Sequence, residues 1–182
     1  MELVSTMGSG QLGRELELQT LVMEIEKSFG ESVEIKFTSD SIVTIRLEGE
    51  GPAYTVFRTG TFQVRGAETE DQLFEAARRF RDMLSNIGVE MLDYEFDHVT
   101  SVLMEDFEQE VHLEALTLAL GMEHTEYEPE QFPGLIYRPP EFEVTLLIFS
   151  SGKVIIGGTT ERDEASAAID HLREELVAVK NI

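Results

Sequence analysis

Residues 126–138 read EYEPEQFPGLIYR, and residues 146–156 read LLIFSSGKVII. In the first stretch, Phe132 stands directly before Pro133 and Gly134. Proline fixes φ and glycine permits a tight change of direction, so the phenylalanine is expected at a bend. The second stretch has two apolar runs around a Ser-Gly turn, which is typical of a β-hairpin. Together they predict an aromatic side chain presented beside an antiparallel hairpin.

The chain follows one order of elements twice: a short strand, a helix, several antiparallel strands and a long helix. Apolar periodicity and turn residues place the boundaries. Strands are predicted at 3–7, 33–37, 42–47, 54–58, 61–65, 98–103, 125–128, 134–138, 143–149 and 153–157. Helices are predicted at 14–29, 73–87, 113–120 and 165–179. We therefore expect an N-terminal repeat at residues 1–92 and a C-terminal repeat at residues 93–182.

The spacing of matching residues supports an internal duplication. Matching residues in the hairpins of the two halves are 92 positions apart, and matching residues in the first helix of each half are 95 positions apart. The two copies therefore differ in length by three residues between helix and hairpin. The matched pairs are Gly60 and Gly152, Gly66 and Gly158, Phe57 and Phe149 at the first offset, and Leu18 and Leu113 at the second.

The order of elements predicts an α+β fold in which the sheets of two halves join edge to edge and the long helices lie on one face. The opposite face would then be uncovered. An uncovered antiparallel sheet that carries Leu147, Phe149 and Ile155 would expose an apolar patch, which usually marks a partner site.

The composition excludes several classes of protein. The chain has no cysteine, so disulfides and thiolate zinc sites are excluded. No apolar run approaches the roughly 20 residues of a membrane span, and the N-terminus has no signal-peptide pattern. We therefore expect a cytoplasmic protein without a membrane partner.

The net charge of −22 comes from 36 acidic against 14 basic residues. Such a surface repels a polyanion at low salt. The acidic residues are dispersed, and there are few lysines, which favours a protein adapted to concentrated salt, where repulsion is screened. An acidic surface matched to a basic partner is the alternative.

Residues 8–13 read GSGQLG and match the dinucleotide-binding pattern G-x-G-x-x-G. A nucleotide-binding fold would continue with alternating parallel strands and helices, whereas hairpins follow here. We interpret the segment as a flexible loop between strand and helix. The four histidines have no metal-ligand spacing, and no residues suggest catalysis, a metal or a cofactor.

Residues 98–180 resemble the second repeat of the archaeal and eukaryotic TATA-box-binding proteins, through EYEPEQFPGLIYR (126–138), LLIFSSGKVIIGG (146–158) and the preceding LEALTLALGMEHT (113–125). The first half resembles the first repeat more faintly, through its order of elements and Phe57, Gly60, Gly66 and Ala67. The resemblance implies a pseudo-symmetric, duplicated saddle with a continuous curved antiparallel sheet and two long helices on the convex face.

The resemblance also implies the residues that contact DNA. In this family, pairs of phenylalanines enter base steps in the minor groove, where unstacking costs a few kcal/mol per step and exposes groove surface. Phe132 and Phe149 hold the wedge positions of the second repeat, and Phe57 holds one in the first. The other is Asp40 at the offset of 92, or Phe37 at the offset of 95, with the three extra residues in the turn at 38–41. We favour Phe37, because it keeps the spacing from helix to wedge equal in both halves. The groove-facing and phosphate-side positions of the second repeat are Leu147, Ile155, Val102, Arg138 and Lys153.

Other positions depart from the family pattern. Thr100 stands near the position of a base-contacting asparagine, and Thr55, Gln63 and Arg65 stand where the first repeat has apolar residues or threonine. Symmetric TATA recognition therefore does not follow from the resemblance.

The resemblance implies a general transcription initiation factor from a salt-adapted archaeon, which binds AT-rich promoter DNA. Glu128 and Glu130 match acidic positions through which the family holds transcription factor B. The alternative is a diverged paralogue that modulates transcription through protein contacts with weak or no DNA binding. The sequence leaves the DNA target, an activating or repressing role, and a homodimer of the free protein open.

Overall fold

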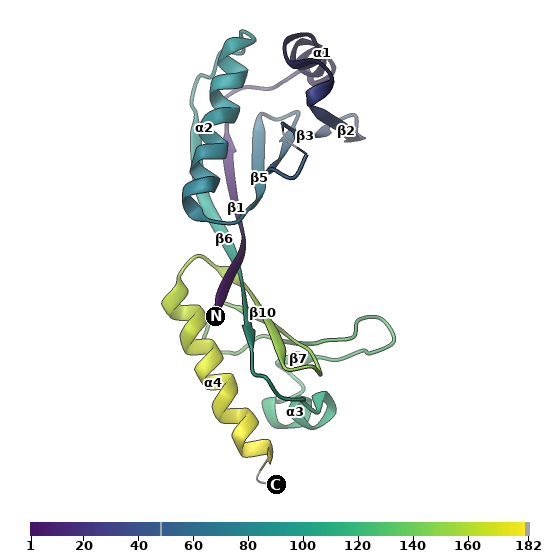
Figure 1. Cartoon of the computed structure of the whole chain (residues 1–182), viewed down its shortest axis with the longest axis vertical. Helices are drawn as coiled ribbons and strands as arrows, with labels where there is room; N and C mark the ends of the chain where they lie inside the picture. The colour runs from purple at the N-terminus through teal and green to yellow at the C-terminus, as the bar shows by residue number, and fades with distance from the viewer. Residues whose placement is uncertain (48, 181–182) are drawn as a thin grey trace. The chain divides into compact units, whose positions relative to one another are not determined.

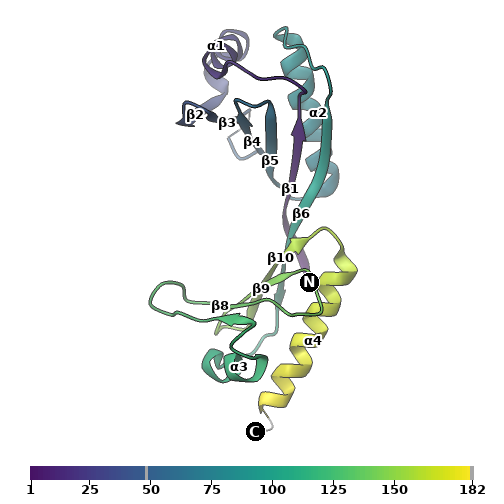
Figure 2. The same cartoon turned by 180° about the vertical axis from the view of Figure 1, so that it is seen from behind.

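The computed structural model describes residues 1–47 and 49–180. The chain forms two compact units (Figures 1 and 2). We call Ser5–Val99 the first unit, and Met1–Val4 together with Thr100–Ile182 the second unit. The predicted boundary between the repeats, after residue 92, remains a prediction about the duplication and is distinct from this division into compact units.

The strands of the first unit are antiparallel and lie in the order β2-β3-β4-β5-β1. Its elements are β1 (Glu2–Gln11), α1 (Leu18–Phe29), the short 3-10 helix η1 (Gly30–Ser32), β2 (Glu34–Ser39), β3 (Ile42–Arg46), β4 (Ala53–Phe57), β5 (Thr61–Ala67) and α2 (Glu70–Asn86).

The second unit repeats the arrangement, with the strand order β6-β10-β9-β8-β7. Its elements are β6 (Glu95–Asp106), α3 (Leu113–Leu120), β7 (Thr125–Glu126), β8 (Leu135–Tyr137), β9 (Thr145–Ile148), β10 (Lys153–Thr159) and α4 (Arg162–Lys180). Strands β1 and β6 each carry residues of both units.

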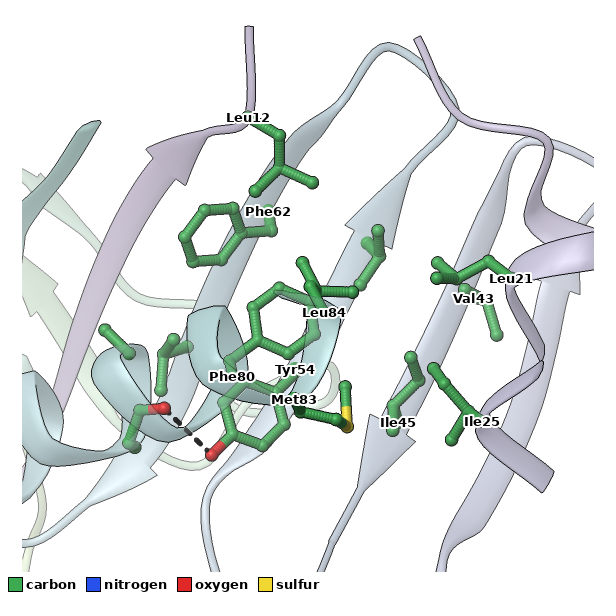
Figure 3. Close-up of a cluster of buried hydrophobic side chains, with 14 of the residues drawn as sticks. Leu12, Leu21, Ile25, Val43, Ile45, Tyr54, Phe62, Phe80, Met83 and Leu84 are labelled. Atoms are coloured by element: carbon green, nitrogen blue, oxygen red, sulfur yellow. Dashed lines mark hydrogen bonds between the residues drawn. The ribbon is translucent and has the colours of Figure 1, made fainter. Parts of the chain in front are cut away.

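Each unit buries one face of its strands under helices. In the first unit, α2 packs on β5, and the ring of Phe80 stacks on Tyr54 at 4.8 Å between centroids (Figure 3). The Tyr54 hydroxyl donates to the Ala76 carbonyl of α2 at 3.1 Å, which satisfies a buried polar group. In the second unit, α4 packs on β10 in the same way. The opposite face of each set of strands is the one we call the open face.

The two units repeat the same loop contacts. In the first unit, Leu12 N donates to Gly60 O at 3.0 Å and Leu16 N to Arg58 O at 2.8 Å. In the second unit, the corresponding bonds join Phe107 to Gly152 at 3.0 Å and Val111 to Ser150 at 2.9 Å. The donor residues of the two units are 95 positions apart in the sequence, and the acceptor residues are 92 positions apart. The contacts therefore reproduce both offsets that the sequence suggested.

The difference of three residues has two parts. Leu18 lies 17 positions before Ile35 of β2, whereas Leu113 lies 12 positions before Thr125 of β7. Ile35 pairs with Ile45, ten positions later, whereas Thr125 pairs with Tyr137, twelve positions later. The first copy is thus five residues longer from α1 to β2 and two residues shorter around the hairpin. The extra residues do not lie in the turn at 38–41.

Residues 8–11 of the GSGQLG segment belong to β1, so the interpretation of 8–13 as a flexible loop is wrong for them. A Cβ on Gly8 would lie 2.2 Å from Cζ of Phe96, and one on Gly10 would lie 2.3 Å from the Glu95 carbonyl. Both glycines are therefore explained by the close approach of β6, with no need for a bound phosphate.

Candidate nucleic-acid interface

The open face of the second unit carries four apolar side chains in one cross-strand row. Ile136 of β8 pairs with Leu147 of β9, Leu147 pairs with Ile155 of β10, and Ile155 pairs with Met104 of β6. Directly paired residues lie on the same face of a sheet. Each member is half-buried, whereas the alternating residues Leu146, Ile148 and Ile156 are buried on the helix side. We call these four residues the apolar row.

Phe132 and Phe149 lie together beside this row. Phe149 follows Leu147 by two residues and so faces the same way. Its amide donates to Lys153 O at 2.9 Å. The two rings meet edge to face, with centroids 5.8 Å apart and planes at 65°. Gly134 makes room for them, since a Cβ there would lie 2.7 Å from Cε1 of Phe132 and 3.1 Å from Cε1 of Phe149. The structure thus brings together the two predicted wedge residues of the second repeat.

The loop between β7 and β8 holds Phe132 by its backbone. The amides of Gln131 and Phe132 both donate to the Glu128 carbonyl at 2.9 Å. The Glu128 carboxylate accepts a hydrogen bond from the Gln131 side-chain amide. Glu128 and Glu130 are both exposed. This loop therefore carries an aromatic ring and two solvent-facing acidic residues within five positions.

The two predicted phosphate-side residues of the second unit lie near carboxylates. Arg138 Nη1 lies 2.7 Å from Oε1 of Glu126, with both side chains more than half exposed. Lys153 is exposed and pairs across the strands with Asp106. The attraction of these cations for a phosphate is therefore weakened by neighbouring negative charge.

Val102 lies on β6 between the buried Ser101 and Leu103, so its half-buried side chain points to the open face with Met104. Thr100 faces the same way and accepts a hydrogen bond from the Gly158 amide at 3.3 Å. That amide belongs to the irregular stretch of β10 between Ile156 and Thr159. A threonine hydroxyl tied to the backbone in this way has less freedom than an asparagine amide to reach a base.

The open face of the first unit has polar residues at the equivalent positions. Thr44 of β3 pairs with Thr55 of β4, Thr55 pairs with Gln63 of β5, and Gln63 pairs with Ser9 of β1. We call these four residues the polar row. It corresponds, one residue for one, to the apolar row of the second unit at the offsets of 92 and 95.

The neighbouring row of the first unit carries two arginines. Arg46, Ala53, Arg65 and Met7 pair in sequence across β3, β4, β5 and β1. Within residues 1–47 and 49–180, neither arginine is in an ion pair. Arg46 Nη1 donates to the Gly49 carbonyl at 3.1 Å, and Arg65 donates to Oε1 of Gln63. At the offset of 92, Arg46 corresponds to Arg138 of the second unit, whereas Arg65 stands where the second unit has Gly157.

Phe57 lies on the open face of the first unit, but the structure does not place Phe37 beside it. Phe57 pairs with Ile42, and both are half-buried. Phe37 pairs with Val43, whose side chain is in the core, so Phe37 points toward the helix side at the edge of the sheet and is 42% exposed. Asp40 is exposed in the tight turn between β2 and β3. This hairpin is two residues shorter than its counterpart, and within residues 34–46 no aromatic side chain lies beside Phe57 on the open face as Phe132 lies beside Phe149.

Sequence reasoning missed Ile136, Met104 and Ile42. Ile136 and Met104 each stand two residues from a position that was noted, and strand alternation would place them on the same face. Ile42 begins β3 directly after the turn that holds Asp40, so alternation from a noted position does not reach it. Their membership in a row also depends on strand register, which is not evident from a single sequence.

Tyr137 lies behind the apolar row, on the helix side of β8. It is buried, and its hydroxyl lies 3.2 Å from Nε2 of His171 on α4. Burial, together with the nearby charges of Glu141 and Glu175, raises the pKa of Tyr137 from about 10 to about 12. The phenol therefore stays neutral and packs as part of the core that supports the row.

Comparisons with known proteins agree with this arrangement. The model of the family described as "Transcription factor TFIID (or TATA-binding protein, TBP)" matches residues 1–87 and 96–179. TATA-box-binding protein C of Halobacterium salinarum is 34% identical over 180 residues, which cover 97% of each chain. The TATA-box-binding protein of Archaeoglobus fulgidus is 30% identical over 177 residues, covering 97% of this chain and 94% of the relative.

A solved structure gives the same result. The chain matches "Methanococcus jannaschii TBP" with a TM-score of 0.76 and 28% identity, covering 98% of both chains. This match confirms the predicted fold class, a duplicated α+β fold of the TATA-binding-protein type. The relatives come from archaea, and halophiles such as Halobacterium salinarum and Haloarcula marismortui are among them, in agreement with the salt adaptation that the acidic composition favours. No helix within the described part of the chain is long and apolar enough to cross a membrane. The sequence match over both repeats and the structural match together show that this chain belongs to the TATA-binding protein family of transcription factors.

Proposed function

We propose that this protein is a general transcription initiation factor that binds AT-rich promoter DNA in the minor groove. The observation that carries the proposal is the apolar row of the second unit together with the pair formed by Phe132 and Phe149. Such a surface suits the floor of a widened minor groove, where A·T pairs present no amino group that would need a hydrogen-bond partner.

The two phenylalanines act as a wedge. They unstack one base step, and the resulting bend brings more groove surface against the apolar row. Leu147, Ile155 and Val102 contact the groove, and Arg138 and Lys153 contact phosphates. Phe57 contacts the other half of the site from the first unit.

The exposed carboxylates of Glu128 and Glu130 bind transcription factor B. Acidic groups on a loop beside a basic partner set orientation and association rate. The protein acts in the cytoplasm, where promoter DNA is found in archaea. A homodimer of the free protein would cover the same apolar row and compete with DNA.

High salt is part of the proposal. The net charge of −22 opposes approach to DNA only over distances up to about the Debye length, which is roughly 3 Å at 1 M salt. DNA binding should therefore persist at molar potassium chloride, where most phosphate-binding proteins lose affinity.

The test is fluorescence anisotropy with a labelled AT-rich duplex in molar potassium chloride. Phe149→Ala should weaken binding on the order of tenfold to a hundredfold, because stacking of an aromatic ring on a base is worth about 1–3 kcal/mol. Phe37→Ala is the matched control and should bind within about twofold of wild type, since Phe37 points away from the open face.

A second arm adds transcription factor B. Glu128→Gln with Glu130→Gln should leave binding to DNA alone unchanged and weaken assembly of the ternary complex. The proposal fails if wild type binds no duplex with or without transcription factor B, or if Phe149→Ala binds as well as wild type. Binding of transcription factor B without DNA would favour the diverged paralogue instead.

A further inference from the structure

The two open faces differ in chemistry at the same register positions. In the second unit the cross-strand row is Ile136, Leu147, Ile155 and Met104. In the first unit the equivalent residues are Thr44, Thr55, Gln63 and Ser9. Every aliphatic or thioether side chain of one row has a hydroxyl or amide as its counterpart in the other.

The polar row can accept hydrogen bonds from a ligand. Among the residues that the structure describes, the hydroxyls of Thr44 and Thr55 make no hydrogen bond, and both side chains are half-buried. The Ser9 hydroxyl donates to the Phe62 carbonyl at 3.3 Å, which leaves its oxygen free to accept. Oε1 of Gln63 accepts from Arg65, an exposed side chain that can turn instead to a phosphate.

The minor groove distinguishes base pairs by one group. A·T and T·A pairs present only acceptors, N3 of adenine and O2 of thymine, whereas G·C pairs add the N2 amino donor of guanine. Against an apolar row this amino group would lose its water and gain no partner, which is costly for a buried donor. Against a row of hydroxyl and amide oxygens it would find an acceptor.

We propose that the first unit accepts G·C pairs in its half of the DNA site, so that the target needs A·T pairs only in the half contacted by the second unit. The polar row acts as the acceptor for the guanine amino group, and Arg46 and Arg65 beside it contribute contacts to the backbone phosphates. This inference rests on the proposed function, because it concerns the specificity of the same surface.

The experiment uses three duplexes with identical outer base steps and different interior base pairs. The A·T duplex has A·T pairs in both interior halves, the mixed duplex has A·T pairs in one half and G·C pairs in the other, and the G·C duplex has G·C pairs in both. The outer steps are the same in all three, so that the cost of kinking the DNA is matched. The mixed duplex needs no assigned direction, since the protein can turn to place its second unit on the A·T half. Affinities are measured by anisotropy in molar potassium chloride.

Wild type should bind the mixed duplex within about threefold of the A·T duplex and bind the G·C duplex at least about tenfold more weakly. The double variant Thr55→Leu with Gln63→Ile copies the residues of the second unit. It should bind the mixed duplex at least about tenfold more weakly than the A·T duplex. If this variant does not fold, the test uses the reverse variant, Leu147→Thr with Ile155→Gln. The preference of the reverse variant for the A·T duplex over the G·C duplex should fall below about threefold.

The outcomes separate the two proposals. Loss of about tenfold on the mixed duplex by wild type, with normal binding to the A·T duplex, overturns this inference and leaves the proposed function intact. A folded Thr55→Leu with Gln63→Ile variant that still tolerates the mixed duplex also overturns it, as does a reverse variant that keeps the wild-type preference. Failure of wild type to bind the A·T duplex at all overturns the proposed function itself.

Discussion

Replacing Gly152 with alanine should destabilise the second unit by about 3–4 kcal/mol. Gly152 has φ of +89°, and a Cβ there would lie 2.2 Å from the Gln109 carbonyl oxygen. A left-handed conformation costs a residue with a side chain roughly 1–2 kcal/mol. Relief of the clash would separate the turn from residues 107–111 and break the hydrogen bonds Phe107–Gly152 and Val111–Ser150, each worth about 1 kcal/mol.

The chain contains controls that separate these contributions. Gly66 has φ of +84°, but among the described residues no atom apart from its chain neighbours lies within 4 Å of its Cβ position. Gly66→Ala should therefore show only the conformational cost of about 1–2 kcal/mol. Gly157 has no positive φ, and in the described part of the chain only its chain neighbours lie within 4 Å of its Cβ position. Gly157→Ala should therefore change stability by less than about 0.5 kcal/mol.

The assay is urea unfolding followed by circular dichroism at one fixed molar concentration of potassium chloride. The predicted order of destabilisation is Gly152→Ala, then Gly66→Ala, then Gly157→Ala. Since the Gly152 amide donates to the Phe149 carbonyl at 2.9 Å, the first variant should also lose DNA affinity. Equal destabilisation by Gly152→Ala and Gly66→Ala would refute the argument from close approach.

Two further predictions concern single side chains. Because the pKa of Tyr137 is raised to about 12, the unfolded chain ionises first as pH rises above 10, and stability is lost between pH 10 and 12. Urea titrations should show this loss, on the order of 1–2 kcal/mol, in wild type and a smaller loss in Tyr137→Phe; equal slopes would contradict it. Glu126→Gln should free Arg138 for a phosphate, raise DNA affinity, and steepen the dependence of log K on log salt by about one unit. Glu123→Gln is the control, and the idea fails if both variants change the slope equally.

Much of the fold follows from local sequence. The offsets of 92 and 95 residues reappear as matched hydrogen bonds at Gly60 and Gly152. The helix 113–120 was predicted with its observed bounds, because its apolar positions and the following Gly121 mark both ends. EYEPEQFPGLIYR also places Phe132 against Phe149, since the proline, the glycine and the hairpin turn together fix the approach of the two rings.

Other features depend on tertiary contacts and compensating lengths. The net difference of three residues is the sum of two changes in the first copy: the segment from α1 to β2 is five residues longer, and the hairpin of β2 and β3 is two residues shorter. The two changes are distinguished only by the strand register. This is why Phe37 could be aligned with a wedge position although its side chain points to the helix side. Gly8 and Gly10 suggested a loop because the residues that require glycine at these positions belong to β6, more than 80 residues later in the sequence. The contrast between the polar and apolar rows likewise becomes visible only when paired strands are laid side by side.

The most direct test of the account measures which groove of DNA the protein contacts. Replacing A·T with inosine·cytosine pairs changes the major groove to resemble G·C but keeps the minor groove free of the N2 amino group. If the apolar row lies in the minor groove, the inosine duplex should bind within about threefold of the A·T duplex, while the G·C duplex binds at least about tenfold more weakly. Equal loss of affinity on the inosine and G·C duplexes would contradict minor-groove binding.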